Sequence, residues 1–333
     1  MTNRREFIQS AVGAAILGSA TFKQAWAQSG LPIEQVKVLY GFPPGSAGDI
    51  CARRVAEKFG GTAYSKNQGV IDSRPGAGGQ IALNLLKSAP ADGSVLAMTP
   101  FSGISLYPHI FKNLQYKPFE DFTPVGTSSM IHHGFAVGPM VPASVKNVKD
   151  FVAWAKANPA QASYGSPAAG STPHFIGSLL GREANVDLKH VAFRGTQPAI
   201  LDMIGGQIAA VSGPIGEFTQ HVAAGKCRLL AATGAKRSQF APNTPTLVEQ
   251  GLKGFVYDEW FGFYVPAKTP TDIINRLNAV MRVALAAPET VNGMAMMGLV
   301  AQSSSPAELA ARLKSDTELW GPLVKTIGFS ADA

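Results

Sequence analysis

The stretch VKVLYGFPPGSAGD, residues 36–49, contains the order of elements on which the fold rests. Its first five residues are a short, mostly apolar run, which predicts a strand. The segment 42–49 is rich in glycine and proline and predicts a loop. Behind it, apolar residues recur at helical spacing from Ile50 to Phe59. A strand, a Gly-rich loop and a helix in this order predict the opening of an α/β fold.

Similar units follow along the chain. A second Gly-rich loop, 74–79, precedes a helix marked by Ile81, Leu85 and Leu86, and a strand at 95–98 enters the segment 99–102. Ser171 or Thr172 is the expected N-cap of a helix that has Pro173 in its first turn. Further strands are expected at 163–164, 191–193 and 229–233, and further helices at 151–157, 198–204, 273–285 and 306–319.

Length and composition indicate two lobes without a nucleic-acid partner. Domains commonly contain about 100–200 residues, so a chain of 333 residues favours two of them. The pattern places the start of the second lobe near residue 130. The net charge of +7 is spread along the chain without a run of Lys or Arg, so we expect a solubilising surface charge and no nucleic-acid binding.

The first 27 residues have the features of an export signal. Arg4 and Arg5 form a positive region, an apolar stretch runs from 11 to 22, and Ala25-Trp26-Ala27 is a small-x-small cleavage signal. The arginine pair followed by Glu6, Phe7 and Ile8 favours the twin-arginine route, and general secretion is the alternative. No later segment offers about 18 uninterrupted apolar residues, so we expect a soluble mature protein in the periplasm.

Motifs for metals, cofactors and catalysis fail when they are compared with the sequence. Cys51 and Cys227 are the only cysteines, and we expect two buried thiols in different lobes. The loop 74–79 lacks the final glycine of a dinucleotide fingerprint, since Ile81 stands there. The adjacent His132 and His133 point apart on a strand and make a poor metal site. We expect no cofactor, no metal and no catalytic residues.

Three loops that lead into helices share features that favour binding of an anion. The segments 42–49, 165–173 and 194–197 are rich in glycine or serine. Such a loop allows close approach of a ligand and presents free N–H groups at the positive end of a helix. The combination binds carboxylates without a cationic side chain, and it occurs in both expected lobes.

Taken in order along the mature chain, these motifs resemble the Bug-type periplasmic solute-binding receptors of the tripartite tricarboxylate transporter family. Ser46 stands at the usual second glycine of the first loop, and Arg194 stands where lysine is common. The matching segments are Phe42-Pro43-Pro44-Gly45-Ser46-Ala47-Gly48-Asp49 with Ala52-Arg53, Arg74-Pro75-Gly76-Ala77-Gly78-Gly79, Ala91-Asp92-Gly93, Asn158-Pro159, Tyr164-Gly165-Ser166, Gly170-Ser171 with His174, Arg194-Gly195-Thr196 with Pro198-Ala199, Ala224-Gly225-Lys226, Pro245-Thr246 with Glu249 and Gly251, and Trp260 with Gly262.

The resemblance implies a two-lobed α/β Venus-flytrap of the type II-like periplasmic binding class, with the ligand cleft between the lobes. The hinge is then crossed twice, so 28–130 and 257–333 form lobe 1 and 131–256 forms lobe 2. The implied function is an extracytoplasmic receptor that binds a small di-/tricarboxylic or aromatic acid and delivers it to integral-membrane transporter subunits. A sensor subunit for a signalling partner and an exported enzyme are the alternatives. We expect a monomer.

Seventeen residues are candidates for the ligand cleft. Arg194 either reaches a ligand carboxylate or forms a surface salt bridge, and Phe101 either packs on the ligand or belongs to the core. Asp49 and His174 either contact ligand or order their own loops. The candidates are Phe42, Pro44, Gly45, Ser46, Asp49, Thr99, Phe101, Ser102, Gly165, Ser166, Gly170, Ser171, Thr172, His174, Arg194, Gly195 and Thr196.

The leader generates the first testable prediction. Protein recovered from the periplasm should begin at Gln28, because cleavage follows Ala27. Replacing Arg4 and Arg5 together with lysine should stop export, because the twin-arginine route requires the pair. N-terminal sequencing and cell fractionation check both points. Recovery of intact Met1 would contradict cleavage, and unchanged export of the double variant would indicate general secretion.

Overall fold

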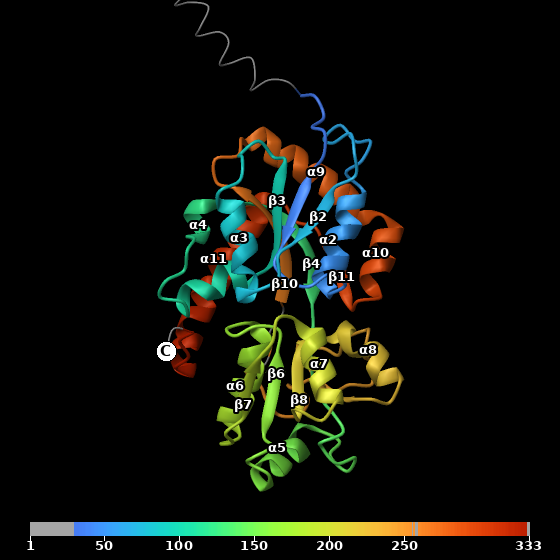
Figure 1. The fold of residues 1–333 in the computed structure, drawn as a ribbon, viewed down its shortest axis with the longest axis vertical. Coiled ribbons are helices and arrows are strands. Elements are labelled where there is room, and N and C mark those ends of the chain that lie inside the picture. Colours follow the sequence, from blue (N-terminus) through green and yellow to red (C-terminus); the bar gives the residue numbers. More distant parts are fainter. Residues whose placement is uncertain (1–29, 255, 257–258, 332–333) are drawn as a thin grey trace, which may run out of the picture.

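The computed structural model describes residues 30–254, 256 and 259–331, which form two lobes stacked along the long axis of the molecule (Figure 1). Each lobe is built around one mixed β-sheet with helices on both faces. The expected leader, 1–27, lies outside the described residues. Within the described part of the chain, no helix is long and apolar enough to span a membrane.

Lobe 1 contains a six-stranded sheet of order β11-β4-β10-β3-β1-β2. β1 pairs in parallel with β2 and β3, whereas β10 pairs antiparallel with β3 and β4. The strands are β1 (Lys37–Tyr40), β2 (Val70–Ser73), β3 (Val95–Pro100), β4 (Phe122–Ile131), β10 (Glu259–Pro266) and β11 (Leu299–Ala301).

The helices of lobe 1 lie on both faces of this sheet (Figure 1). Helices α2, α9 and α10 pack on one face, and α3 and α11 pack on the other. Their bounds are α2 (Ala47–Glu57), α3 (Gln80–Lys87), α4 (Pro118–Asp121), α9 (Thr271–Ala286), α10 (Pro288–Ala295) and α11 (Pro306–Ile327), with short turns η2 (Ala77–Gly79), η3 (Ser102–Leu106) and η4 (Tyr107–His109).

Lobe 2 contains a five-stranded sheet of order β7-β6-β8-β5-β9. β6 is parallel to β7 and β8, and β5 is antiparallel to β8 and β9. The elements are β5 (His133–Val137), α5 (Val148–Ala157), β6 (Ser163–Ser166), α6 (Thr172–Glu183), β7 (Lys189–Ala192), α7 (Thr196–Ile204), β8 (Ala210–Pro214), α8 (Ile215–Ala223) and β9 (Arg228–Ala232).

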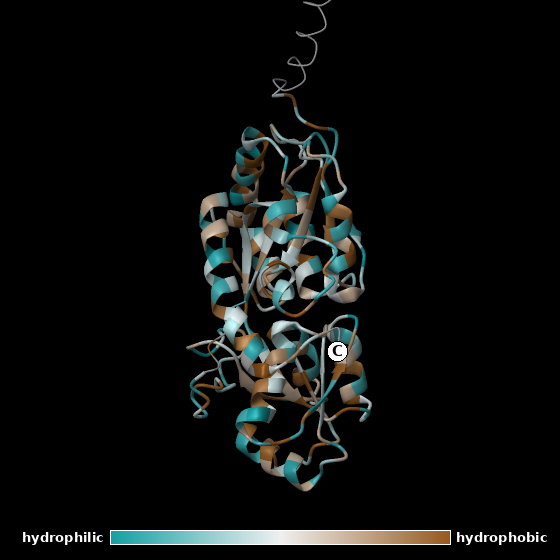
Figure 2. Cartoon of the chain, turned by 90° about the vertical axis from the view of Figure 1, so that its left-hand side faces the viewer, coloured by the Kyte–Doolittle hydropathy of each residue, from teal (hydrophilic) through white to brown (hydrophobic). Residues whose placement is uncertain are grey.

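The central strands are buried on both faces, so alternate side chains enter two cores. In β10, Trp260 and Tyr264 pack toward α11, while Phe261, Phe263 and Val265 pack toward α2 and α9. Side chains of successive strand residues point to opposite faces, which produces this division. Figure 2 shows mainly apolar colours along the central strands and more hydrophilic positions on the outer helices.

The chain passes between the lobes twice. It leaves lobe 1 between Ile131, the end of β4, and His133, the start of β5. It returns between Ala232 and Glu259, which open onto β10. The two lobes are therefore joined by two chain connections, an arrangement that suits hinge motion between them.

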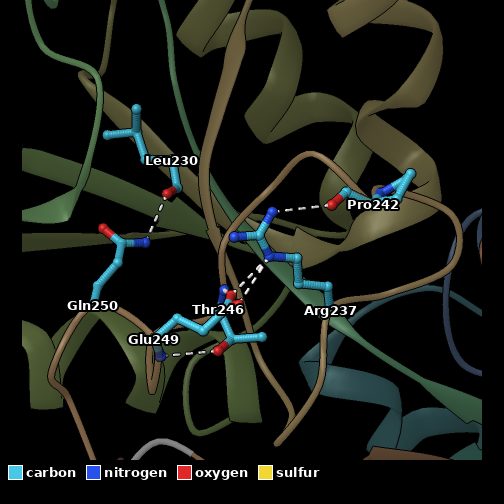
Figure 3. A network of polar contacts seen from close by, with 6 residues as sticks. All are labelled: Leu230, Arg237, Pro242, Thr246, Glu249 and Gln250. Carbon is cyan, nitrogen blue, oxygen red and sulfur yellow. Dashed lines mark hydrogen bonds and ion pairs between the residues drawn. The ribbon is translucent and has the colours of Figure 1, made fainter.

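A polar network orders the segment that follows β9 (Figure 3). The carboxylate of Glu249 accepts hydrogen bonds from the Thr246 N–H at 2.7 Å and from Arg237 Nε at 2.9 and 3.0 Å. The Glu249 N–H in turn donates to the Thr246 hydroxyl at 3.0 Å. Gln250 Nε2 donates to the Leu230 carbonyl of β9 at 2.9 Å. The Pro-Thr-x-x-Glu segment seen in the sequence thus fixes the return path of the chain.

The strand–loop–helix units expected from the sequence are present, but some of their ends differ, and the strands β2, β4, β5, β8, β10 and β11 were not located. The expected loop 42–49 already contains the first turn of α2, which begins at Ala47. Gly165, expected in a loop, lies inside strand β6. Of the three residues that predict α3, Leu86 is buried, whereas Ile81 and Leu85 are exposed, and Leu83 completes the buried face.

Cys51 and Cys227 are buried free thiols, as predicted. Cys51 belongs to the core of lobe 1 and Cys227 to that of lobe 2. Burial raises the pKa of each thiol to about 11, so both stay protonated at neutral pH.

Trp260 generates a prediction about stability. It is fully buried, and its indole Nε1–H donates to Asp316 Oδ2 of α11 at 2.8 Å. Trp260→Phe should lower the free energy of unfolding by about 2–4 kcal/mol, because it removes a charge-assisted hydrogen bond and buried volume. Urea denaturation measures the change.

Trp154→Phe is the matched control for this variant. Trp154 is half-buried, and its indole N–H has no partner among the described residues. The same chemical change should therefore cost less there. Equal losses at the two positions would contradict the importance of the Trp260–Asp316 hydrogen bond.

Candidate functional site

A cavity of about 50 Å³ lies between the two lobes. It is lined by the carboxyl ends of β1 and β3 in lobe 1 and of β8 in lobe 2, together with the loops that follow strands. Crevices outside the carboxyl ends of strands are the usual ligand sites of α/β folds. The lining residues are Tyr40, Phe42, Ser46, Ala47, Gly48, Pro100, Ser102, Ile131, His133, Pro167, Ser171, Pro173, Gly195, Thr196, Pro214, Glu217, Glu259 and Phe261.

Three helices begin at this cavity. α2 starts at Ala47 behind the N-cap Ser46, α7 starts at Thr196 behind Gly195, and α6 starts behind the N-cap Ser171. The first N–H groups of a helix lack intrahelical acceptors and lie at the positive end of its dipole. Helix ends of this kind can bind a carboxylate without a cationic side chain, and no lysine or arginine is among the lining residues.

Asp49 holds the loop that leads into α2. Its carboxylate is buried and accepts hydrogen bonds from the Gly45 N–H and from Arg53 Nε, each at 2.8 Å. Ser46 Oγ donates to the Pro43 carbonyl at 2.8 Å. These contacts fix the turn from which the N–H groups of α2 point into the cavity. Asp49 itself is not among the lining residues.

A second set of contacts holds the loop that leads into α6. Ser171 Oγ donates to the Ala168 carbonyl at 2.7 Å, and His174 Nδ1 accepts from the Gly170 N–H at 3.0 Å. His174 stacks on His190 with ring centroids 3.8 Å apart. Burial, aided by the neighbouring His190, lowers the pKa of His174 to about 3, so the imidazole is a neutral support of the loop.

The structure brings six of the seventeen candidates to the cavity and places eleven elsewhere. Arg194, with Phe42, lines a larger neighbouring cavity of about 300 Å³. Phe101 packs between Trp260 and Trp320 in the core of lobe 1. The six are Phe42, Ser46, Ser102, Ser171, Gly195 and Thr196. The eleven are Pro44, Gly45, Asp49, Thr99, Phe101, Gly165, Ser166, Gly170, Thr172, His174 and Arg194.

Gly165 and Ser166 support the site from behind. A Cβ on Gly165 would lie 2.8 Å from the Ile208 side chain and 2.9 Å from the Phe193 ring, so tight packing inside lobe 2 favours glycine there. The Ser166 hydroxyl is fully buried and contacts His190 Nε2 at 2.8 Å. Loop chemistry in the sequence did not distinguish such residues from those that face the cavity.

Sequence reasoning missed the ionisable groups of the cavity. His133 Nε2 hydrogen-bonds the buried carboxylate of Glu259 at the point where the chain crosses between lobes. Glu217, in the first turn of α8, is 5% exposed, and its carboxylate accepts from the Ala47 N–H and from Gln197 Nε2, both at 3.3 Å. No motif in the sequence marked Glu217, because α8 follows directly on the end of β8, at Pro214, without a glycine-rich loop between them.

Burial of Glu217 changes its ionisation. Removal from water raises its pKa to about 7, and the hydrogen bonds from Ala47 and Gln197 offset only part of this effect. Near neutral pH the group is therefore divided between its protonated and ionised forms.

The chain matches the tripartite tricarboxylate transporter family receptor over residues 52–329. It belongs to this family. A Pseudomonas sp. protein encoded in the tcbD–tcbE intergenic region is 30% identical over 94% of this chain and 92% of its own length. Two solved structures, each 27% identical and covering 90% of this chain and 99% of their own, are the periplasmic binding protein BugD, with a TM-score of 0.82, and an R. palustris protein with adipate, with a TM-score of 0.84.

These findings confirm the resemblance to Bug-type receptors and the two-lobed α/β fold of periplasmic binding proteins. The family is named as transporter receptors, BugD is named as a periplasmic binding protein, and the R. palustris protein is named with adipate.

The ionisation of Glu217 generates a prediction about stability. Its pKa of about 7 in the folded protein exceeds the value of about 4.3 in an unfolded chain, so wild type loses stability as pH rises from about 4.5 to 7. Glu217→Gln cannot ionise and escapes this loss. The variant should be more stable than wild type by about 1–3 kcal/mol at pH 8, and the difference should vanish near pH 4.5.

Denaturation in urea across this pH range measures the difference. Glu318→Gln is the control, since Glu318 is exposed on α11 and does not line the cavity. A Glu217→Gln variant that follows the wild-type pH profile would show that Glu217 titrates alike in the folded and unfolded states.

Proposed function

We propose that this protein is an extracytoplasmic receptor that closes its two lobes around a small carboxylate and delivers it to integral-membrane subunits of a tripartite tricarboxylate-type transporter. The observation that carries the proposal is the convergence of three helix N-termini, those of α2, α6 and α7, on one cavity between the lobes. Lobe 1 supplies one of them and lobe 2 supplies two. A carboxylate held by both lobes therefore stabilises the closed arrangement.

Main-chain N–H groups supply most of the recognition in this proposal. Each hydrogen bond to a charged oxygen contributes roughly 1.5–3 kcal/mol, and a helix N-terminus adds about 0.3–1 kcal/mol. Hydroxyl groups of Ser102 and Thr196 line the same cavity and can donate as well. The rings of Tyr40, Phe42 and Phe261 form apolar walls against which the body of an organic acid packs.

The comparisons support the class of ligand and the place of action. The family is named for receptors of a transporter, BugD is named as a periplasmic binding protein, and the R. palustris relative is named with adipate. The leader 1–27 provides the route of export, after which the mature chain, from Gln28, acts in the periplasm.

The proposal predicts that the ligand binds as an anion. A thermal-shift screen of mono-, di- and tricarboxylic and aromatic acids identifies the best ligand, and titration calorimetry compares it with its amide. The amide should bind at least tenfold more weakly, because about 1.4 kcal/mol corresponds to a factor of ten and at least one charge-assisted hydrogen bond is lost. Ser102→Ala should weaken binding of the acid by less than tenfold, since the backbone remains. Equal affinities of acid and amide would contradict the carboxylate site.

A further inference from the structure

Glu217 reaches from lobe 2 into the cavity in which the ligand is expected to bind. Its oxygens lie between the N-termini of α2 and α7, where they accept from the Ala47 N–H of lobe 1 and from Gln197 of lobe 2. Both distances are 3.3 Å, at the long end of the range for N–H···O hydrogen bonds. An ionised carboxylate offers about four acceptor positions, so Glu217 retains capacity for a ligand donor.

The charges of the cavity are unbalanced around Glu217. Apart from Glu217, the lining contains one further carboxylate, Glu259, and one imidazole, His133, and these two are paired with each other. Within the described part of the chain, Glu217 forms no salt bridge. The groups that hydrogen-bond its oxygens, the Ala47 N–H, the Gln197 amide and the Thr196 hydroxyl, are neutral. His133 favours the ionised form of Glu217, but its imidazole is already hydrogen-bonded to Glu259.

We propose, building on the carboxylate site above, that Glu217 makes this receptor selective for acids that carry a protonated nitrogen and disfavours dicarboxylates of the same length. One end of such a ligand is an anion for the helix N-termini, and the nitrogen donates to Glu217 and neutralises it. A dicarboxylate instead brings a second negative charge close to a carboxylate that has no cation, in a site with little water to screen the repulsion.

Two observations agree with a missing cation at Glu217. Burial raises the pKa of Glu217 to about 7, and its hydrogen bonds and the attraction of His133 offset only part of this rise. Glu217 also lines the same cavity as the residues at the N-termini of α2, α6 and α7, so the anion and the second charged group of one ligand can reach the helix N-termini and Glu217 respectively. A ligand ammonium or pyridinium supplies the charge that the protein leaves out.

Matched probes of equal length test this selectivity. The six-carbon set is adipate, hexanoate, 6-aminohexanoate and 2-aminohexanoate, which differ in the presence and position of a second carboxylate or an ammonium. The four-carbon set is succinate, butanoate, 4-aminobutanoate and 2-aminobutanoate. Titration calorimetry at pH 7.5 gives the Kd of each probe for wild type, for Glu217→Gln and for the surface control Glu318→Gln.

In wild type, the better amino acid of a set should bind at least tenfold more tightly than the dicarboxylate of that set. Glu217→Gln should reduce this ratio at least tenfold, through both weaker amino-acid binding and tighter dicarboxylate binding, and Glu318→Gln should leave it unchanged. A circular-dichroism melt of each variant verifies that it is folded. Because glutamine has the shape of glutamate, a change in this ratio, rather than a loss of all binding, reports the charge.

Two results would overturn the inference in distinguishable ways. Tighter binding of the dicarboxylate by wild type, or an unchanged ratio in Glu217→Gln, would refute the role of Glu217 and leave the carboxylate site intact. Failure of every acid of both sets to bind wild type and Glu217→Gln would refute the carboxylate site itself, and the selectivity with it.

Discussion

The insertion of β10 between β3 and β4 determines how the rest of the molecule is arranged. β10 comes after the whole of lobe 2 in the chain, yet it occupies a central position in the sheet of lobe 1 and is buried along its length. The chain must therefore cross between the lobes twice, and lobe 2 hangs from two adjacent connections. His133 and Glu259, which hydrogen-bond each other, stand at the two crossings. Both residues of this pair line the cavity between the lobes.

The cavity contains groups that attract anions and groups that repel them. Three helix N-termini make it favourable for anions, whereas Glu217 and Glu259 are buried carboxylates in the same space. Glu259 is hydrogen-bonded directly to His133, whereas the direct contacts of Glu217 are hydrogen bonds from neutral groups. The backbone thus provides affinity for a carboxylate that is common to any acid, while the side chain of Glu217 decides what the rest of the acid carries.

The sequence predicted the α/β fold and the strand–loop–helix units, because periodicity and glycine-rich turns depend on local physics. It also predicted that Ser46, Ser171 and Gly195 lie at helix N-termini around one space. It did not separate Gly165, whose missing side chain serves packing within lobe 2, from Gly195, which faces lobe 1. It gave no sign of Glu217, since a glutamate in a first helical turn is ordinarily a solvated residue and only the position of the opposite lobe buries it.

Contacts between the lobes differ in whether a ligand can influence them. A Cβ on Gly195 would lie 2.9 Å from Pro43, and one on Gly216 would overlap the backbone of Met297, so these contacts between the lobes are steric and do not depend on the ionisation of a side chain. The Glu217–Ala47 hydrogen bond is different, because its acceptor lies inside the cavity and its strength depends on the ionisation of Glu217. A ligand shifts the closure equilibrium only by what it contributes to one state. By holding Glu217 ionised, a protonated nitrogen strengthens a contact between the lobes that the protein alone leaves weak.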